Sequence, residues 1–183
     1  MKKATLAVSF GSSGAQAGQN CIRPIAAALQ WAFPEHELRC AYSSRSIINR
    51  LWGRGEVVES ETEALLRLPA EGFAEIAVMP VYIIRGAEYE WVRAAAGSCW
   101  VSEVLLENEE DLTWMAEVLC GIFAEEGRPL LVMGHGSGHV GDESYSRLRE
   151  RLPEGVYLAC VEGENTLEAL LPELESLQEK NST

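Results

Sequence analysis

Six short runs rich in Val, Leu, Ile and Ala recur along the chain, and segments with helical spacing of apolar residues separate them. The runs are residues 4–10, 38–42, 75–83, 101–106, 130–133 and 156–161. Several are apolar at successive positions rather than at alternate ones, which is typical of parallel strands covered on both faces. Strands that alternate with helices predict βαβ units, so the sequence predicts an α/β fold built on parallel sheets.

Six helices are expected, because apolar side chains recur at helical spacing between these runs and after the last one. They span residues 19–33, 61–68, 87–96, 109–124, 142–152 and 166–177. Pro34 ends the first helix, and Pro172 is expected to kink or split the last one. A polar break with Gly and Pro at residues 125–129 predicts a domain boundary, with a first lobe over residues 1–126 and part of a second over residues 127–183.

The expected second lobe contains only two of the six strands. A two-stranded sheet is marginal by itself and leaves unpaired edges. The leucine-rich face of the last expected helix, residues 166–177, also needs a surface to pack on. We therefore expect the chain to form a homo-oligomer through this half-lobe.

Charge and composition narrow the possible functions. Lys and Arg number 15 and Asp and Glu number 28, which gives a net charge of −13. Nucleic-acid binders carry a basic patch, so no nucleic-acid partner is expected. No apolar run approaches the roughly 18 residues of a membrane span, and a first strand explains the start of the chain better than a signal peptide does. The five cysteines form no CxxC pair, which favours free thiols in a reducing cytoplasm. A cytoplasmic protein is expected.

The candidate binding residues follow the strands, because ligands of open parallel sheets bind beyond the carboxyl ends of the strands. Ser12 and Ser13 lie in a Gly/Ser segment whose backbone N–H groups can hold anionic oxygens, although a plain strand–helix turn has the same composition. Arg45 and Arg85 follow the second and third runs, and their guanidinium forks suit carboxylates. Solvated surface arginines would give the same pattern, and the sequence alone leaves these two interpretations level.

His135 lies in a Gly-His-Gly segment directly after the fifth run, where the glycines are expected to expose its imidazole. Such a histidine can accept a proton near neutral pH or bind a metal. The segment lacks the HExxH pattern of metallopeptidases and the GxSxG pattern of serine hydrolases. Glu88 and Glu162 follow two other strands, and both carboxylates also fit ordinary helix starts.

Together these junctions resemble those of the anaerobic cobalt chelatases, the sirohydrochlorin cobaltochelatases of the class II chelatase superfamily. The resembling segments keep the family's order and are residues 1–13, 44–51, 83–90, 133–136 and 161–162. The resemblance implies ferrochelatase-like parallel sheets flanked by helices, one complete lobe plus part of a second, around a tetrapyrrole cleft. It also implies insertion of a divalent metal into sirohydrochlorin, without ATP, on the way to cobalamin.

The resemblance assigns roles to individual residues. His135 matches a metal-site histidine and is expected to act as base and metal ligand, with Glu88 as a second catalytic group and Glu162 as a metal-site carboxylate. The residues expected to hold the peripheral carboxylates of the substrate are Ser12, Ser13, Arg45 and Arg85. No cofactor is expected beyond the substrate metal ion, for which Co²⁺ is expected and Ni²⁺ or Fe²⁺ would suit the same ligands.

One departure from the family pattern leaves alternatives open. The family carries a second active-site histidine on a later strand–loop segment, and this chain ends before that segment. A second interpretation is therefore a non-catalytic tetrapyrrole- or metal-binding remnant of a chelatase. A third is an α/β subunit that needs a partner to complete its sheet.

Overall fold

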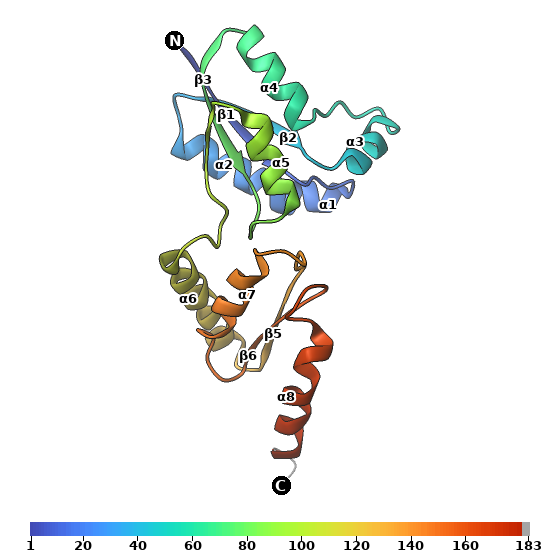
Figure 1. Cartoon of the computed structure of the whole chain (residues 1–183), viewed down its shortest axis with the longest axis vertical. Helices are drawn as coiled ribbons and strands as arrows, with labels where there is room; N and C mark the ends of the chain where they lie inside the picture. Colours follow the sequence, from blue (N-terminus) through green and yellow to red (C-terminus); the bar gives the residue numbers. More distant parts are fainter. Residues whose placement is uncertain (181–183) are drawn as a thin grey trace. The chain divides into compact units, whose positions relative to one another are not determined.

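The computed structural model describes residues 1–180, which fold into two compact units. The first unit comprises residues 1–83 and 88–104, and the second comprises residues 84–87 and the residues from 105 onward. Each unit contains parallel strands flanked by helices (Figure 1). The expected α/β fold class is confirmed.

A four-stranded parallel sheet, in the order β2-β1-β3-β4, forms the centre of the first unit. Its strands are β1 (Lys2–Ser9), β2 (Glu37–Tyr42), β3 (Phe73–Pro80) and β4 (Trp100–Val101). Its helices are α1 (Ala15–Ala17), α2 (Arg23–Ala32), α3 (Arg45–Trp52), α4 (Glu61–Ala70) and α5 (Ala87–Ala96). A π-helix at Gly18–Ile22 joins α1 to α2.

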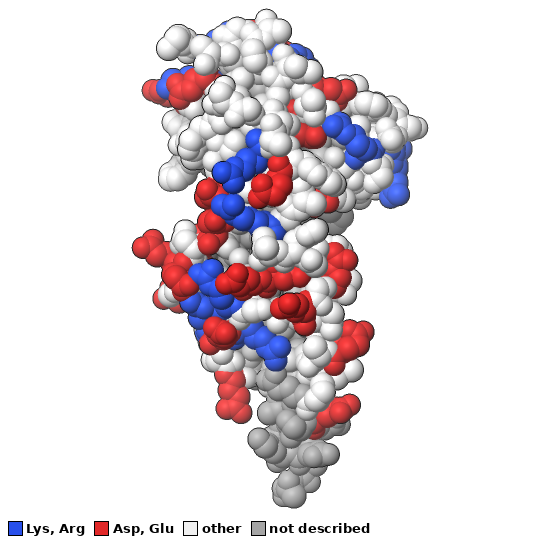
Figure 2. Space-filling model, viewed as in Figure 1, with Lys and Arg blue, Asp and Glu red and all other residues white. Residues whose placement is uncertain are grey.

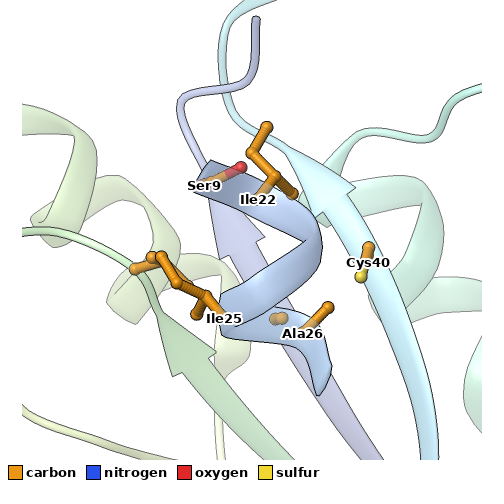
Figure 3. Close-up of a pocket in the computed structure, with 7 residues that line it drawn as sticks. Ser9, Ile22, Ile25, Ala26 and Cys40 are labelled. Carbon is orange, nitrogen blue, oxygen red and sulfur yellow. The ribbon is translucent and has the colours of Figure 1, made fainter. Parts of the chain in front are cut away.

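Strand β1 is buried on both faces, as its continuous apolar run predicted. Leu6 and Val8 are fully buried in a cluster with side chains of α4 and α5. Ala7 lies on the opposite face, because neighbouring residues of a strand alternate in direction. There it lines a small cavity of about 20 Å³ together with Ala26 of α2 (Figure 3). The two sets of helices therefore cover both faces of the first sheet.

The second unit is built on two parallel strands, β5 (Leu130–Gly134) and β6 (Val156–Cys160), with Gly134 opposite Cys160. Its helices are α6 (Glu109–Glu126), α7 (Asp142–Arg149) and α8 (Leu167–Lys180). Helices α6 and α7 cover one face of these strands, where Leu112, Tyr145 and Leu158 share a buried cluster. On the other face of β5 the side chains of Leu131 and Met133 are exposed, so helices cover only one face of this strand.

The apolar run at residues 101–106 forms strand only at its first position, because β4 ends at Val101. Beyond β4 the chain leaves the sheet, and Val104 is buried in the first unit while Leu106 is buried in the core of the second. The run therefore reflects a segment that crosses from one core to the other. The expected boundary at residues 126/127 also differs from the observed division, because α6 packs with β6 and α7.

Three expectations for the helices need correction. The expected helix over residues 19–33 begins earlier, with α1, and includes the π-helix before α2. Helix α3 was not expected, although Ser44 caps it and Ile48 and Leu51 are buried on one side. Helix α8 continues through Pro172, so the expected split is wrong. Among the described residues, no helix combines the length and the apolar character that crossing a bilayer requires.

The segment at residues 84–87 is fastened inside the second unit by a close approach of two backbones. A Cβ atom on Gly141 would lie only 1.8 Å from the carbonyl oxygen of Arg85, so this position accepts only glycine. Ile84 from the same segment is buried against the second core. Neither unit is therefore a continuous stretch of chain.

We expect Ser60→Ala to lower the free energy of unfolding by about 1–2 kcal/mol, because the capping box of α4 is lost. The buried Ser60 hydroxyl accepts a hydrogen bond from the Glu63 N–H group and donates one to its carboxylate. Urea unfolding measures the change. Thr62→Ala, an exposed change in the same turn, is the control and should cost less. Equal losses in the two variants would contradict the role given to the capping box.

Candidate functional site

His135 and Glu162 meet because the backbone pairing of β5 and β6 continues past both strands. The Val161 N–H group donates to the Gly134 carbonyl oxygen at 3.1 Å, and the Glu162 N–H group donates to the His135 carbonyl oxygen at 2.9 Å. The two side chains therefore project from neighbouring loops, with 3.9 Å between His135 Nε2 and Glu162 Oε1. Their side chains are 79% and 56% exposed, so both can reach a ligand.

A glycine is required between these two loops. Gly136 has a φ of +82°, in the left-handed region, and a Cβ atom there would lie 2.0 Å from the Glu162 carbonyl oxygen. Any side chain at this position would push the loops apart. Gly136 therefore allows the two loops to approach each other, which brings the His135 imidazole close to the Glu162 carboxylate.

Asp142 holds the loop that carries His135. This carboxylate is buried at the first position of α7 and accepts hydrogen bonds from the Ser137 N–H group at 2.8 Å, the Ser137 hydroxyl at 3.1 Å and the Gly138 N–H group at 2.9 Å. It also touches the Glu162 loop, since a Cβ atom on Gly163 would lie 2.1 Å from Asp142 Oδ2. Asp142 therefore packs against both loops at once.

The pair offers one imidazole and one carboxylate to a metal ion. Among the described residues, no three His, Cys, Asp or Glu side chains form a group that could hold a metal by themselves. An ion at the pair would therefore complete its coordination with water or with a bound substrate. Such an open arrangement suits a metal that is passed on rather than kept.

Glu88, the other carboxylate expected in catalysis, belongs to the first unit and is half-buried in the first turn of α5. It lies near Tyr82, whose hydroxyl donates a hydrogen bond to Ser43 Oγ at 2.8 Å. Burial raises the pKa of Tyr82 to about 12, and the negative charges of Glu88 and Glu61 add to the rise. Tyr82 therefore stays neutral near pH 7 and acts as a hydrogen-bond donor beside Glu88.

The two arginines expected at the substrate belong to different units, and both hold carboxylates of the protein. Arg45, in the first unit, pairs with Glu61 at 3.1 Å, and Arg85, in the second, pairs with Glu107 at 2.7 Å. On the face in Figure 2, basic side chains generally lie beside acidic ones. The positive bias that the sequence indicated near the strand ends is thus partly neutralised.

The Gly/Ser segment after β1 is held by two arginines that were not among the predicted site residues. The Ser13 hydroxyl accepts a hydrogen bond from Arg50 at 3.2 Å, and its carbonyl oxygen accepts one from Arg54. Ser12 Oγ accepts the Gly14 N–H group at 3.1 Å. Ser12 and Ser13 thus follow the end of β1, as expected, and Arg50 of α3 and Arg54 just after it both reach Ser13.

The fold is that of a class of α/β chelatases. The crystal structure of the sirohydrochlorin chelatase SirB from Bacillus subtilis subspecies spizizenii, in complex with cobalt, matches with a TM-score of 0.61 over 100% of this chain and 85% of that chain, at 14% identity. A model of the cobalt chelatase (CbiK) family matches residues 3–183. The chain belongs to the cobalt chelatase (CbiK) family.

Two relatives have names that state an activity. The chain is 29% identical over 189 residues to the sirohydrochlorin cobaltochelatase CbiKC of Nitratidesulfovibrio vulgaris (strain Hildenborough), with 95% of this chain and 67% of that protein covered. It is 28% identical over 158 residues to the sirohydrochlorin cobaltochelatase of Salmonella typhimurium (strain LT2), with 81% of this chain and 60% of that protein covered. The chain therefore spans about two thirds of the length of these relatives.

We expect Asp142→Ala to loosen the loop at residues 136–139 and to lower the free energy of unfolding by about 1–3 kcal/mol, since partly buried donors lose their acceptor. Hydrogen exchange of the Ser137 and Gly138 amides should accelerate, because their N–H groups donate to this carboxylate. Asp111→Asn is the control, since Asp111 belongs to the capping box of α6 in the same unit and its replacement should leave these two amides unchanged. Unchanged exchange in Asp142→Ala would show that another group holds the loop.

Proposed function

We propose that this protein inserts a divalent metal ion, cobalt first of all, into sirohydrochlorin without ATP, as a step in cobalamin biosynthesis. Membership of the cobalt chelatase family and the names of the two relatives support this activity. The observation that carries the proposal is the exposed His135–Glu162 pair at the carboxyl ends of adjacent parallel strands. Metal and tetrapyrrole are both substrates in this reaction, and no further cofactor is proposed.

The chemistry of metal insertion matches this pair. Two pyrrole N–H protons must leave the macrocycle while the metal exchanges its ligands for ring nitrogens. A neutral imidazole can hold a divalent metal through Nε2 or accept a proton, and a carboxylate 3.9 Å away stabilises the resulting positive charge. In this proposal His135 and Glu162 deliver the metal, and His135 accepts a released proton.

The remaining residues are proposed to bind and orient the substrate. Glu88 is proposed to take part in proton transfer from the first unit, beside the neutral hydroxyl of Tyr82. The residues proposed to hold peripheral carboxylates of the tetrapyrrole are Ser12, Ser13, Arg45 and Arg85. Imidazole and carboxylate ligands also accept Ni²⁺ and Fe²⁺, so the choice of metal is tested by competition between ions.

We expect His135→Ala to reduce cobalt insertion by roughly 100-fold or more, because it removes a metal ligand and a base together. The absorbance change of sirohydrochlorin on addition of Co²⁺, without oxygen, measures the rate. His139→Ala is the matched control, because His139 is exposed in the same loop and should keep activity close to wild type. If wild type shifts the spectrum of sirohydrochlorin without forming the cobalt product, the protein binds the tetrapyrrole and is not a chelatase.

Glu162 has a similar test that needs no tetrapyrrole. Glu162→Gln should weaken the binding of Co²⁺ to the free protein by about tenfold, since one charged ligand becomes neutral. Glu164→Gln, an exposed change two residues later, is the control. Equal cobalt affinities in wild type and both variants, measured by titration calorimetry, would remove Glu162 from the metal site.

We also propose that the chain self-associates through the open face of β5. Leu131 and Met133 are 42% and 49% exposed there. Burial of such side chains against a second copy is favourable by the hydrophobic effect. Light scattering at micromolar concentration should give a particle mass of more than one chain. Leu131→Glu should lower that mass towards the value of a single chain. A well-folded monomer would contradict this expectation.

A further inference from the structure

A pocket of about 400 Å³ lies within the first unit, beyond the carboxyl ends of β1 and β2. Ser12, Ser13, Tyr42 and Arg54 are among the residues that line it. Its volume falls in the range of about 300–1,000 Å³ that is usual for small-molecule sites. Its position is also the one where open parallel sheets bind ligands.

The polar lining of this pocket is biased towards positive charge. Arg23, the first residue of α2, and Arg54, which follows α3, are its basic residues, and Glu56 is its one carboxylate. Arg54 is anchored by its hydrogen bond to the Ser13 carbonyl oxygen, which fixes one end of its guanidinium. In a chain with a net charge of −13, this balance favours an anionic ligand.

Two glycines and an unusual helical turn form part of the pocket lining. A Cβ atom on Gly18 would meet nothing within 4 Å, and one on Gly14 would meet only Ser12 Oγ at 3.5 Å. Gly18 also begins the π-helix that ends at Ile22. Such π-helical turns are rare in proteins, and those that occur are often found at functional sites. Below it, Ile22, Ala26 and Cys40 line both this pocket and the small cavity of Figure 3.

We propose that this pocket binds a carboxylate-bearing side chain of the tetrapyrrole, with Arg54 and Arg23 as the groups that recognise the carboxylate. The inference rests on the proposed function and adds two arginines to it. An acetate or propionate arm fits a pocket of this size, and the guanidinium fork matches its carboxylate. Arg45 and Arg85, in contrast, already pair with Glu61 and Glu107.

Gly18 offers a direct way to fill the pocket. Its φ of −59° is helical, so L-residues other than proline can replace it without backbone strain. Gly18→Glu places a carboxylate in the pocket, and Gly18→Gln places a neutral group of the same shape there. Gly121→Glu is the matched control, because a Cβ atom on this α6 glycine also meets nothing within 4 Å.

Titration of each variant with metal-free sirohydrochlorin, followed by absorbance, measures the dissociation constant. Gly18→Glu should raise the dissociation constant at least tenfold, and Gly18→Gln should raise it less. Gly121→Glu should match wild type. The difference between the two Gly18 variants should shrink at high salt, because salt screens the charge of the added carboxylate. Arg54→Gln and Arg23→Gln should each raise the dissociation constant by about three- to tenfold, since each removes one charged donor. In the insertion assay KM should rise with kcat unchanged.

A methyl ester of sirohydrochlorin separates recognition of the carboxylate from a structural effect, because its arms carry no charge. Wild type and the two arginine variants should bind the ester equally. If Gly18→Glu disturbs the helix, Arg23→Gln decides, because it removes the charge from the lining without adding a group to the pocket. Unchanged affinity for the free acid in all these variants, with wild type inserting cobalt, would overturn the pocket and leave the function standing. A wild type that neither binds nor converts sirohydrochlorin would overturn both.

Discussion

The backbone hydrogen bond from Glu162 to the His135 carbonyl oxygen determines the geometry of the candidate metal site. Two exposed side chains on separate loops would normally move independently, and ordering them costs conformational entropy. Here the parallel pairing of β5 and β6 extends beyond the strands and fixes both Cα positions before any ligand binds. The close contact at Gly136 and the buried carboxylate of Asp142 act in the same direction. The flexible part of the site is thus reduced to the side-chain torsions of two residues.

The first unit uses its charges differently from what its composition suggests. An acidic chain can attract an anionic ligand only where arginines gather without matching carboxylates. Arg45 of this unit is already paired with Glu61, whereas Arg50 and Arg54 near Ser13 donate to a hydroxyl and a backbone carbonyl. The positive charge of a guanidinium that contacts a neutral acceptor attracts an anionic ligand more strongly than one already paired with a carboxylate. The contacts of each arginine therefore matter more than its position along the chain.

Sequence patterns predicted the parallel α/β fold class, most helices and the position of His135 after a strand, because apolar periodicity and strand-end motifs are local properties. They missed α3, although Ser44 is a typical helix cap and Ile48 and Leu51 recur at helical spacing after it. They also missed Asp142, because an acidic residue at a helix start is ordinary and its three hydrogen bonds come from a neighbouring loop. The apolar run at residues 101–106 was predicted as one strand for a related reason. Val104 is buried in the first unit and Leu106 in the second, and the sequence does not distinguish this from burial in a single sheet. Pairings that depend on tertiary contacts leave no periodic signal.

The second unit borrows residues 84–87 from the middle of the first, and this has a consequence for synthesis on the ribosome. Ile84 and its neighbours emerge before α6, β5 and β6 exist, so their buried contacts must wait for more than fifty further residues, up to Gly141 and beyond. Until then Ile84 has no core to enter, and transiently exposed apolar surface makes an incompletely folded chain prone to aggregate. While the chain between Ile84 and Gly141 is being made, shielding of this segment therefore protects the growing chain from aggregation.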